Sequence, residues 1–278
     1  MERIPLPSRI EFKKGDEDNQ SILTVEPCFP GYSITLGNAL RRVLLSSLPG
    51  AAVTSFKVKG VDHEFSTIPE VKEDLVEIIL NLKKLRFKVF TDQPVKIRLK
   101  ANGEKKVTGK DIEPNSDMEV VTKDFPIATL TSPKADLDME LTIKRGRGYE
   151  TTEERGKEDK ERLEVGEIAI DAIFTPVHKV AFDTEMVRVG QMTNYERLVL
   201  NITTDGTITP EQALGGAIEI ILAHFNLLEG FGEKIEEPVS ESEEVEAETE
   251  IEVKEEETDE EAKPKKKRGR PKKEDNEE

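Results

Sequence analysis

The clearest chemical feature of the sequence is a short basic run, Lys267-Arg-Gly-Arg-Pro271. Gly269 would let the backbone lie low in the narrow minor groove of a DNA duplex, with Arg268 and Arg270 directed along the groove floor. A-tracts concentrate negative potential there, and the neighbouring lysines would add contacts to phosphates. The run therefore predicts binding to AT-rich DNA. The alternative is a solvated basic segment that pairs loosely with the acidic residues before it.

Residues that could catalyse a reaction or bind a metal are few and widely spaced. The three histidines, His63, His178 and His224, lack ligand spacing and predict no zinc site. The single cysteine, Cys28, cannot form an internal disulfide, which suits a reducing cytoplasm. The motifs GxGxxG, HExxH, GxSxG and the phosphate-binding GxxxxGK are absent. We expect no catalytic residue, no metal and no cofactor in this chain, and an independent enzyme lacks a set of residues to support it.

Charge is distributed unevenly along the 278 residues, whose net charge is −17. Residues 233–278 hold about 20 acidic and about 10 basic side chains, so the rest of the chain carries roughly −7. A segment this polar cannot bury enough apolar surface to fold alone, and we expect a disordered tail. The acidic body argues against a protein that binds nucleic acid through its folded part.

The apolar residues predict neither a membrane span nor secretion. No run of about 18 apolar residues is present. The start, Met1-Glu-Arg-Ile-Pro-Leu-Pro, has no apolar signal core. We expect a cytoplasmic protein with no membrane partner.

Two amphipathic segments are the elements best suited to present an apolar surface. The first, residues 35–48, is expected to be a helix that Pro49-Gly50 ends. The second opens with the capping box Thr209-Pro-Glu-Gln212, extends to about residue 228, and is expected to end at Gly230 and Gly232. Its apolar face is wider than one stripe, because Ile220, Leu222 and Leu227 flank it. Such a helix is either internal to one domain or covered by a partner.

The middle of the sequence is predicted to be rich in β-strands. A capping box at Thr67-Ile-Pro-Glu70 predicts a helix to about residue 82. Residues 86–143 contain short runs in which apolar and polar residues alternate, separated by Gly, Pro, Asn and Asp. Residues 145–162 are charged and contain glycines, so we expect an exposed loop there. Strand patterns return at residues 168–174, 179–189 and 198–203.

A family resemblance rests on six blocks of sequence. The most specific is Gly31-Tyr-Ser-Ile-Thr-Leu-Gly-Asn-Ala-Leu-Arg-Arg-Val-Leu-Leu-Ser-Ser-Leu-Pro-Gly50. The others are residues 63–67, 73–83, 174–177, 188–191 and 205–213. These blocks occur in family order over about residues 1–232, and the chain is identified as a member of the bacterial RNA polymerase α-subunit family, in its amino-terminal domain.

The resemblance implies a two-lobed α+β fold. A terminal lobe, which dimerises in the family, would comprise residues 1–50 plus 176–232. An inserted β-rich lobe would comprise residues 51–175, and a disordered acidic and basic tail residues 233–278. In the family both amphipathic helices pack against their copies in a second subunit. The dimer interface expected here consists of Leu36, Leu40, Val43, Leu44, Leu214, Ile218, Ile221, Phe225 and Leu228.

The resemblance also implies a function as a non-catalytic subunit of DNA-directed RNA polymerase, a nucleotidyltransferase. The homodimer would be the scaffold on which the β and β′ subunits assemble, one copy contacting each. Arg42 matches the family arginine needed for docking β, although on pattern alone it would be a solvated helix residue. The docking residues expected are Arg41, Arg42, Lys179, Val180, Arg188, Gly190 and Gln191. His63 and Glu64 match a family motif and are expected to be structural. Close packing at a helix crossing is expected to explain Gly37-Asn38. Close approach of another helix would explain Gly215-Gly216, for which the alternative is a weak point in the helix.

The tail departs from the family pattern. Family members usually continue into a small helical domain that binds AT-rich promoter DNA, whereas here an acidic run over residues 236–261 precedes the basic one. The basic run resembles the core of an AT-hook, and this DNA-binding element would be a minimal replacement for that domain. Its residues are Lys267, Arg268, Gly269, Arg270 and Pro271. The competing interpretation of the whole chain is a free-standing homodimeric architectural protein that binds DNA through the hook.

Overall fold

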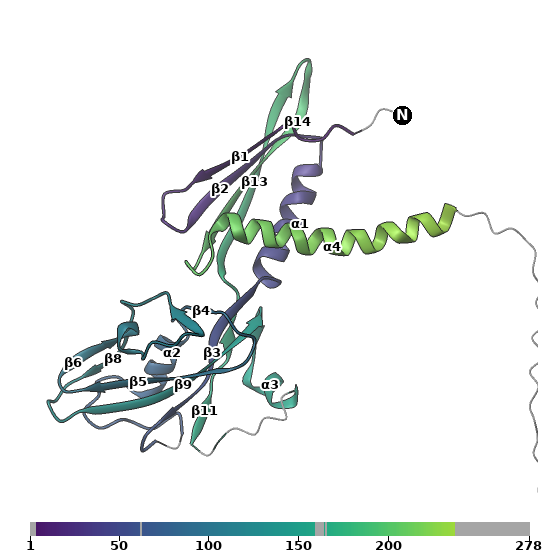
Figure 1. Ribbon diagram of the computed structural model, residues 1–278. Helices are drawn as coiled ribbons and strands as arrows, with labels where there is room; N and C mark the ends of the chain where they lie inside the picture. The colour runs from purple at the N-terminus through teal and green to yellow at the C-terminus, as the bar shows by residue number, and fades with distance from the viewer. Residues whose placement is uncertain (1–3, 62, 159–163, 165, 237–278) are drawn as a thin grey trace, which may run out of the picture. The chain divides into compact units, whose positions relative to one another are not determined.

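The computed structural model describes residues 4–61, 63–158, 164 and 166–236. Residues Met1–Lys234 form one compact unit. Of the second unit, Ile235–Glu278, the structure describes only the first two residues. The fold is mixed α+β, as expected, with two large four-stranded sheets (Figure 1).

One antiparallel sheet combines strands from both ends of the compact unit, in the order β1-β2-β14-β13. Its strands are β1 (Arg9–Lys14), β2 (Gln20–Cys28), β13 (Val177–Val189) and β14 (Met192–Thr204). Alternation along β14 places Leu198, Leu200 and Ile202 in the core and the residues between them toward the other face. This sheet is the base of the terminal lobe.

Two helices, α1 (Tyr32–Ser46) and α4 (Pro210–Glu236), belong to the terminal lobe. The capping box at the start of α4 is confirmed, because the Gln212 N–H donates to Thr209 Oγ1 at 3.2 Å and the Thr209 N–H donates to Gln212 Oε1 at 3.1 Å. The expected end of α4 is wrong. The helix continues through Gly230 and Gly232, and neither adopts the positive φ of a glycine C-cap.

The core of the terminal lobe lies between the sheet and the two helices. Leu44 and Leu48 from the α1 end pack there with Ala213 and Ala217 from the first turns of α4. The strands contribute the remaining buried residues, Leu23, Val25, Cys28, Val177, Val180, Leu198, Leu200 and Ile202. Residues from both ends of the sequence therefore share one hydrophobic core.

The inserted lobe is built on a second antiparallel sheet with the order β11-β3-β9-β5. Its strands are β3 (Pro49–Val58), β5 (Val95–Asn102), β9 (Asp136–Arg147) and β11 (Glu167–Ala169). Three two-stranded ladders surround it: β4 (Phe87–Val89) with β7 (Met118–Val120), β6 (Lys105–Thr108) with β8 (Pro126–Leu130), and β10 (Tyr149–Glu150) with β12 (Ala172–Ile173). A short 3-10 helix, η1 (Gly109–Asp111), follows β6. A separate hydrophobic core fills this lobe.

The helix expected from Thr67 onward is shorter than predicted. Only α2 (Leu75–Leu82) is helical, and its N-cap is Asp74, whose side chain accepts the Glu77 N–H at 2.7 Å. Glu70 has a φ of 64°, and Val71 forms a β-bridge with Leu130. The Thr67 capping box is therefore wrong, because a bridge to β8 holds the segment before α2 in a non-helical conformation.

The expected loop over residues 145–162 is also largely wrong. β9 extends to Arg147, where its end pairs with Pro49 at the start of β3, and α3 (Thr152–Glu158) follows β10. Gly146 permits this pairing, because a Cβ there would lie 2.7 Å from the ring of Phe174. Arg155 then fixes α3, since its guanidinium donates to the carbonyls of Thr54 (2.8 Å) and Ile170 (2.9 Å). Residues 159–162 lie outside the described part of the chain.

Candidate assembly and docking surface

A buried carboxylate positions the first turn of α1. Glu196, on β14, is 6% exposed and accepts the Gly31 N–H at 2.9 Å and the Ser33 N–H at 3.3 Å. The Ser33 hydroxyl also donates to Glu196 and lies 3.0 Å from Thr184 Oγ1. These bonds satisfy N–H groups that have no partner inside the helix, and the negative charge is favourable at a helix N-terminus. The hydrogen bond from the Ser33 hydroxyl is the main reason that the pKa of Glu196 is lowered.

Sequence reasoning missed Glu196, although a signal was present. Positions 196, 198, 200 and 202 all face the core, because side chains along a strand alternate between faces. A glutamate at the start of such a row must find donors. The α1 N-terminus supplies them, and this also explains why α1 begins at Tyr32, earlier than expected.

The residues of α1 expected at a dimer interface differ in exposure. Leu36 is 38% exposed, and Leu40 and Val43 are half-buried. Leu44 is fully buried within the protomer's own core. Tyr32 and Ile34, which the expected interface did not include, are more exposed than Leu36. The outer face of α1 thus presents apolar side chains mainly from its first half.

The apolar side chains of α4 become more exposed toward its carboxyl end. Ala213 and Ala217 are fully buried, and Leu214 and Ile221 are half-buried. Ile218 is 40% exposed, Phe225 60% and Leu228 64%. The 27 residues of α4 span about 40 Å, and only the first turns cover the core (Figure 1). No described residue covers the apolar face beyond them.

The glycines of the two helices have different neighbours. A Cβ at Gly37 would lie 2.6 Å from Phe182 Cδ2, so the close approach at α1 is to a ring of β13 and not to a second helix. A Cβ at Gly216 would lie 3.3 Å from Leu48 Cδ2, whereas one at Gly215 would have nothing within 4 Å. The expectation of a helix crossing is therefore wrong for Gly37, and Gly216 approaches only the Leu48 side chain.

The residues expected to dock large subunits lie in three places. Arg41 and Arg42 are exposed on α1. On β13, Lys179 is exposed and Val180 is buried in the core, so Val180 has little surface to offer a partner. Arg188 lies near the end of β13, and Gly190-Gln191 form the exposed β13–β14 turn, where Arg188 Nε donates to the Gly190 carbonyl at 2.8 Å. Gly190 has a φ of 60°, which this tight turn requires.

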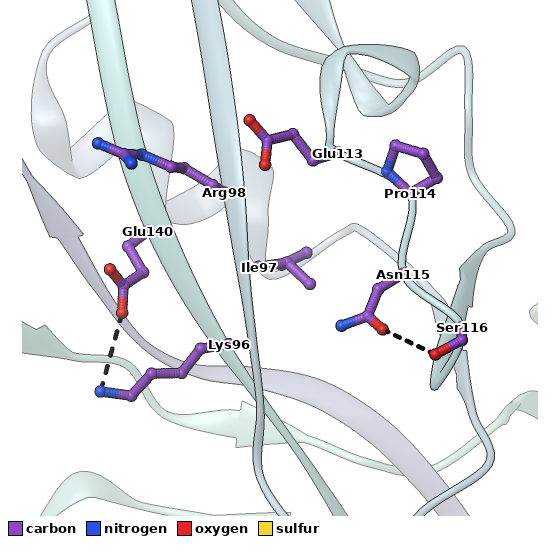
Figure 2. A pocket seen from close by; sticks show the side chains of 8 residues that line it. All are labelled: Lys96, Ile97, Arg98, Glu113, Pro114, Asn115, Ser116 and Glu140. Carbon is purple, nitrogen blue, oxygen red and sulfur yellow. Dashed lines mark hydrogen bonds and ion pairs between the residues drawn. The ribbon is translucent and has the colours of Figure 1, made fainter.

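A shallow groove in the inserted lobe lies between β5 and residues 113–116 (Figure 2). Lys96 Nζ lies 2.8 Å from Glu164 and 3.8 Å from Glu140, and Arg98 makes two hydrogen bonds to Asp138 at 2.7 and 2.6 Å. The guanidinium of Arg98 lowers the pKa of Asp138. Because these charges pair with one another on an exposed sheet face, the groove is best described as solvated surface.

The candidate chemical groups do not converge. His63 is exposed and hydrogen-bonds Ser66, and Glu64 beside it is exposed. Cys28 is buried, and burial raises the pKa of its thiol. The described residues include no group of three His, Cys, Asp or Glu side chains that could hold a metal ion. In the same part of the chain, no helix has the combined length and apolar character needed to cross a membrane. The hook residues Lys267–Pro271 lie outside the described residues.

Comparison with known proteins identifies the family. Residues 56–175 match the model of the RNA polymerase Rpb3/RpoA insert domain. The DNA-directed RNA polymerase subunit alpha of Moorella thermoacetica is 45% identical over 82% of this chain and 71% of that protein. The proteins of the same name from Roseiflexus sp. and Alkaliphilus oremlandii are 47% and 49% identical, over 77% and 76% of this chain and 65% of each relative. The chain thus spans about two thirds of the length of the curated relatives it matches. With its two-sheet α+β fold, the chain belongs to the family of DNA-directed RNA polymerase alpha subunits.

Proposed function

We propose that this chain is a non-catalytic alpha subunit whose homodimer is the platform for assembling the two large subunits, β and β′, of DNA-directed RNA polymerase. The observation that carries the proposal is the apolar face of α4 beyond Ala217, where Ile218, Phe225 and Leu228 have no cover among the described residues. Exposed apolar surface of this extent on a helix marks a protein contact.

A second copy of the chain is the proposed occupant of that face. In a two-fold symmetric dimer the same patch is used twice, so α1 and α4 of one protomer would pack against those of its partner. Obligate interfaces of this kind are large and apolar. The proposed interface keeps Leu36, Leu40, Val43, Leu214, Ile218, Ile221, Phe225 and Leu228 and omits Leu44, which the protomer buries itself.

Docking of the large subunits is assigned to polar residues outside the apolar face. Arg42 is exposed on α1, and its planar guanidinium suits a bidentate contact with a carboxylate across an interface. Arg41, Lys179 and the turn Arg188–Gln191 complete the proposed set. One copy would contact β and the other β′, so a symmetric dimer would support an asymmetric complex.

Co-expression with the two large polymerase subunits of the same organism tests this proposal. A tagged copy should co-purify as a complex of two copies of this chain with one copy of each large subunit, measured by sizing and native mass spectrometry. A homodimer that binds neither large subunit but does bind AT-rich DNA would instead favour the interpretation as a free-standing architectural protein.

A second activity, binding of AT-rich DNA through Lys267–Pro271, rests on the sequence alone. The arginines on either side of Gly269 suit a narrow minor groove. Deleting residues 265–273 should weaken binding of the polymerase to AT-rich upstream DNA more than to GC-rich DNA. A second variant replaces Arg268 and Arg270 with lysine, which keeps the charge and removes the guanidinium groups, and it should lose the preference for AT-rich DNA. If both variants bind like the wild type with unchanged preference, the hook has no role.

A further inference from the structure

An ion pair joins the two lobes beside the second of the two chain connections between them. The chain passes between the lobes at Leu48-Pro49, ahead of β3, and again over residues 174–176, ahead of β13. Arg86 lies in the inserted lobe between α2 and β4, and Asp205 lies in the terminal lobe directly after β14. Arg86 Nε and Asp205 Oδ2 are 3.3 Å apart, and the two side chains are only 10% and 4% exposed.

The backbone on both sides of this contact is firmly held. The Arg86 N–H donates to Thr122 Oγ1 at 2.9 Å, and its carbonyl accepts the Val121 N–H at 2.9 Å. The Asp205 N–H donates to the Pro176 carbonyl at 3.0 Å. The two side chains therefore extend from fixed points, one in each lobe.

Hydrogen bonding also selects the atoms that meet. Asp205 Oδ1 accepts the Thr207 N–H at 2.9 Å, which leaves Oδ2 for the guanidinium. One terminal nitrogen of Arg86 donates to the carbonyls of Lys83 at 3.0 Å and Leu85 at 3.3 Å. Nε has no well-aligned hydrogen bond, so its one charged contact across the lobes is electrostatic. Little water reaches the pair, and salt screens such a contact weakly.

The turn after β14 also packs against the inserted lobe. A Cβ at Gly206 would lie 3.6 Å from Val121 Cγ1 and 3.1 Å from Asn19 Nδ2. Gly206 has a φ of 89°, a conformation that favours glycine. Charge and close packing thus coincide at one place between the lobes.

We infer that Arg86 and Asp205 form an interlobe latch that makes the two lobes of one protomer move as a single body. Removing either partner leaves the other charge buried and uncompensated, which favours separation of the contact so that water can reach that charge. The two lobes would then be held only by their chain connections and the packing near them. The latch concerns a single protomer and does not depend on the proposed docking of large subunits.

The test measures the distance between the lobes in the full chain without large subunits. Spin labels are attached to Lys100→Cys on β5 and Asp183→Cys on β13, which are exposed positions, while the buried Cys28 is protected from labelling. Labelled chain is mixed with an excess of unlabelled chain, so that only distances within one protomer are counted. The latch variants are Arg86→Met and the isosteric Asp205→Asn. The matched control is Arg98→Met, which breaks an arginine–aspartate pair within the inserted lobe.

The latch predicts one narrow distance distribution for the wild type and for Arg98→Met, and a broadened or shifted one for both latch variants. If the distributions of the latch variants are as narrow as the wild type's and have the same mean, the inference is overturned. Asp205→Asn keeps an oxygen for the Thr207 N–H, so it remains decisive if Arg86→Met fails to fold.

Discussion

The Glu196 carboxylate accepts hydrogen bonds from both the backbone N–H and the hydroxyl of Ser33, which ties β14 to the first turn of α1. Some of the residues that sequence reasoning assigned to a dimer interface and to docking lie along this helix, but none of them holds its first turn in place. A buried acidic side chain on a neighbouring strand does so. The geometry of the proposed assembly surface therefore depends on a residue outside it.

Replacing Glu196 with glutamine should destabilise the protein at neutral pH by about 2 kcal/mol, because a charged acceptor of several hydrogen bonds is lost. The pKa of Glu196 is lowered in the folded protein. Its contribution is therefore fully present above the ordinary glutamate pKa and is lost as the pH falls through the lowered value. Urea unfolding at several pH values should show a weaker loss of stability in acid for Glu196→Gln than for the wild type.

Glu185→Gln is the control for this experiment. Glu185 is an exposed glutamate on β13 that pairs with Arg197 at the surface, where such pairs contribute little. Its replacement should leave both the stability and the acid dependence close to those of the wild type. Equal pH dependence in Glu196→Gln and the wild type would show that the carboxylate does not stabilise α1 as described.

Two glycine-to-alanine changes should have opposite effects on the free energy of unfolding. Gly37→Ala places a Cβ 2.6 Å from the Phe182 ring, and overpacking of this kind costs about 1–3 kcal/mol. Gly215→Ala meets nothing within 4 Å and should gain up to about 1 kcal/mol of helix propensity. Thermal unfolding of both variants at the same protein concentration measures the difference. A stabilised Gly37→Ala would contradict the contact with Phe182.

Local sequence patterns are sufficient to predict secondary structure where contacts between neighbouring residues determine it. The capping box at Thr209 is confirmed, and the strand pattern over residues 198–203 lies within β14, which begins six residues earlier, because each feature needs only neighbouring residues. The box at Thr67 satisfied the same rule and failed, since Val71 bridges to Leu130 on a distant strand. Long-range pairing overrode the local preference there.

The proposed assembly surface was also only partly predictable from the sequence, because local patterns find an apolar face but not what packs against it. Helical periodicity found the wide apolar face of α4, but it could not separate buried Leu44 from half-buried Val43 one position before it. That difference depends on what packs against α1. The residues next to Glu196, Arg86 and Asp205 in the sequence do not reveal which groups these side chains contact, because each contact joins residues far apart in the sequence.

Arg42→Ala should prevent recovery of the complex with the large subunits while leaving the homodimer intact. The side chain is exposed and lies off the apolar stripe, so the change removes neither core nor apolar interface. Losing one member of a buried charge pair in a complex costs about 2–5 kcal/mol. Co-purification followed by sizing measures the result. Lys100→Ala, an exposed cation on the inserted lobe, should behave like the wild type, and equal recovery with Arg42→Ala would exclude a docking role for Arg42.

Phe225→Ser combined with Leu228→Ser should dissociate the proposed homodimer without unfolding the protomer. Both side chains are more than half exposed, so they contribute little to the protomer's own core. Truncating an apolar residue at the centre of an interface weakens the free energy of association by about 2 kcal/mol or more, which raises the dissociation constant roughly 30-fold. Sedimentation velocity over a concentration series measures the shift. Leu6→Ser removes a leucine elsewhere that is still more exposed, at 85%, and should leave the association unchanged. A double variant that still sediments as a dimer would show that Phe225 and Leu228 do not carry the dimer contact.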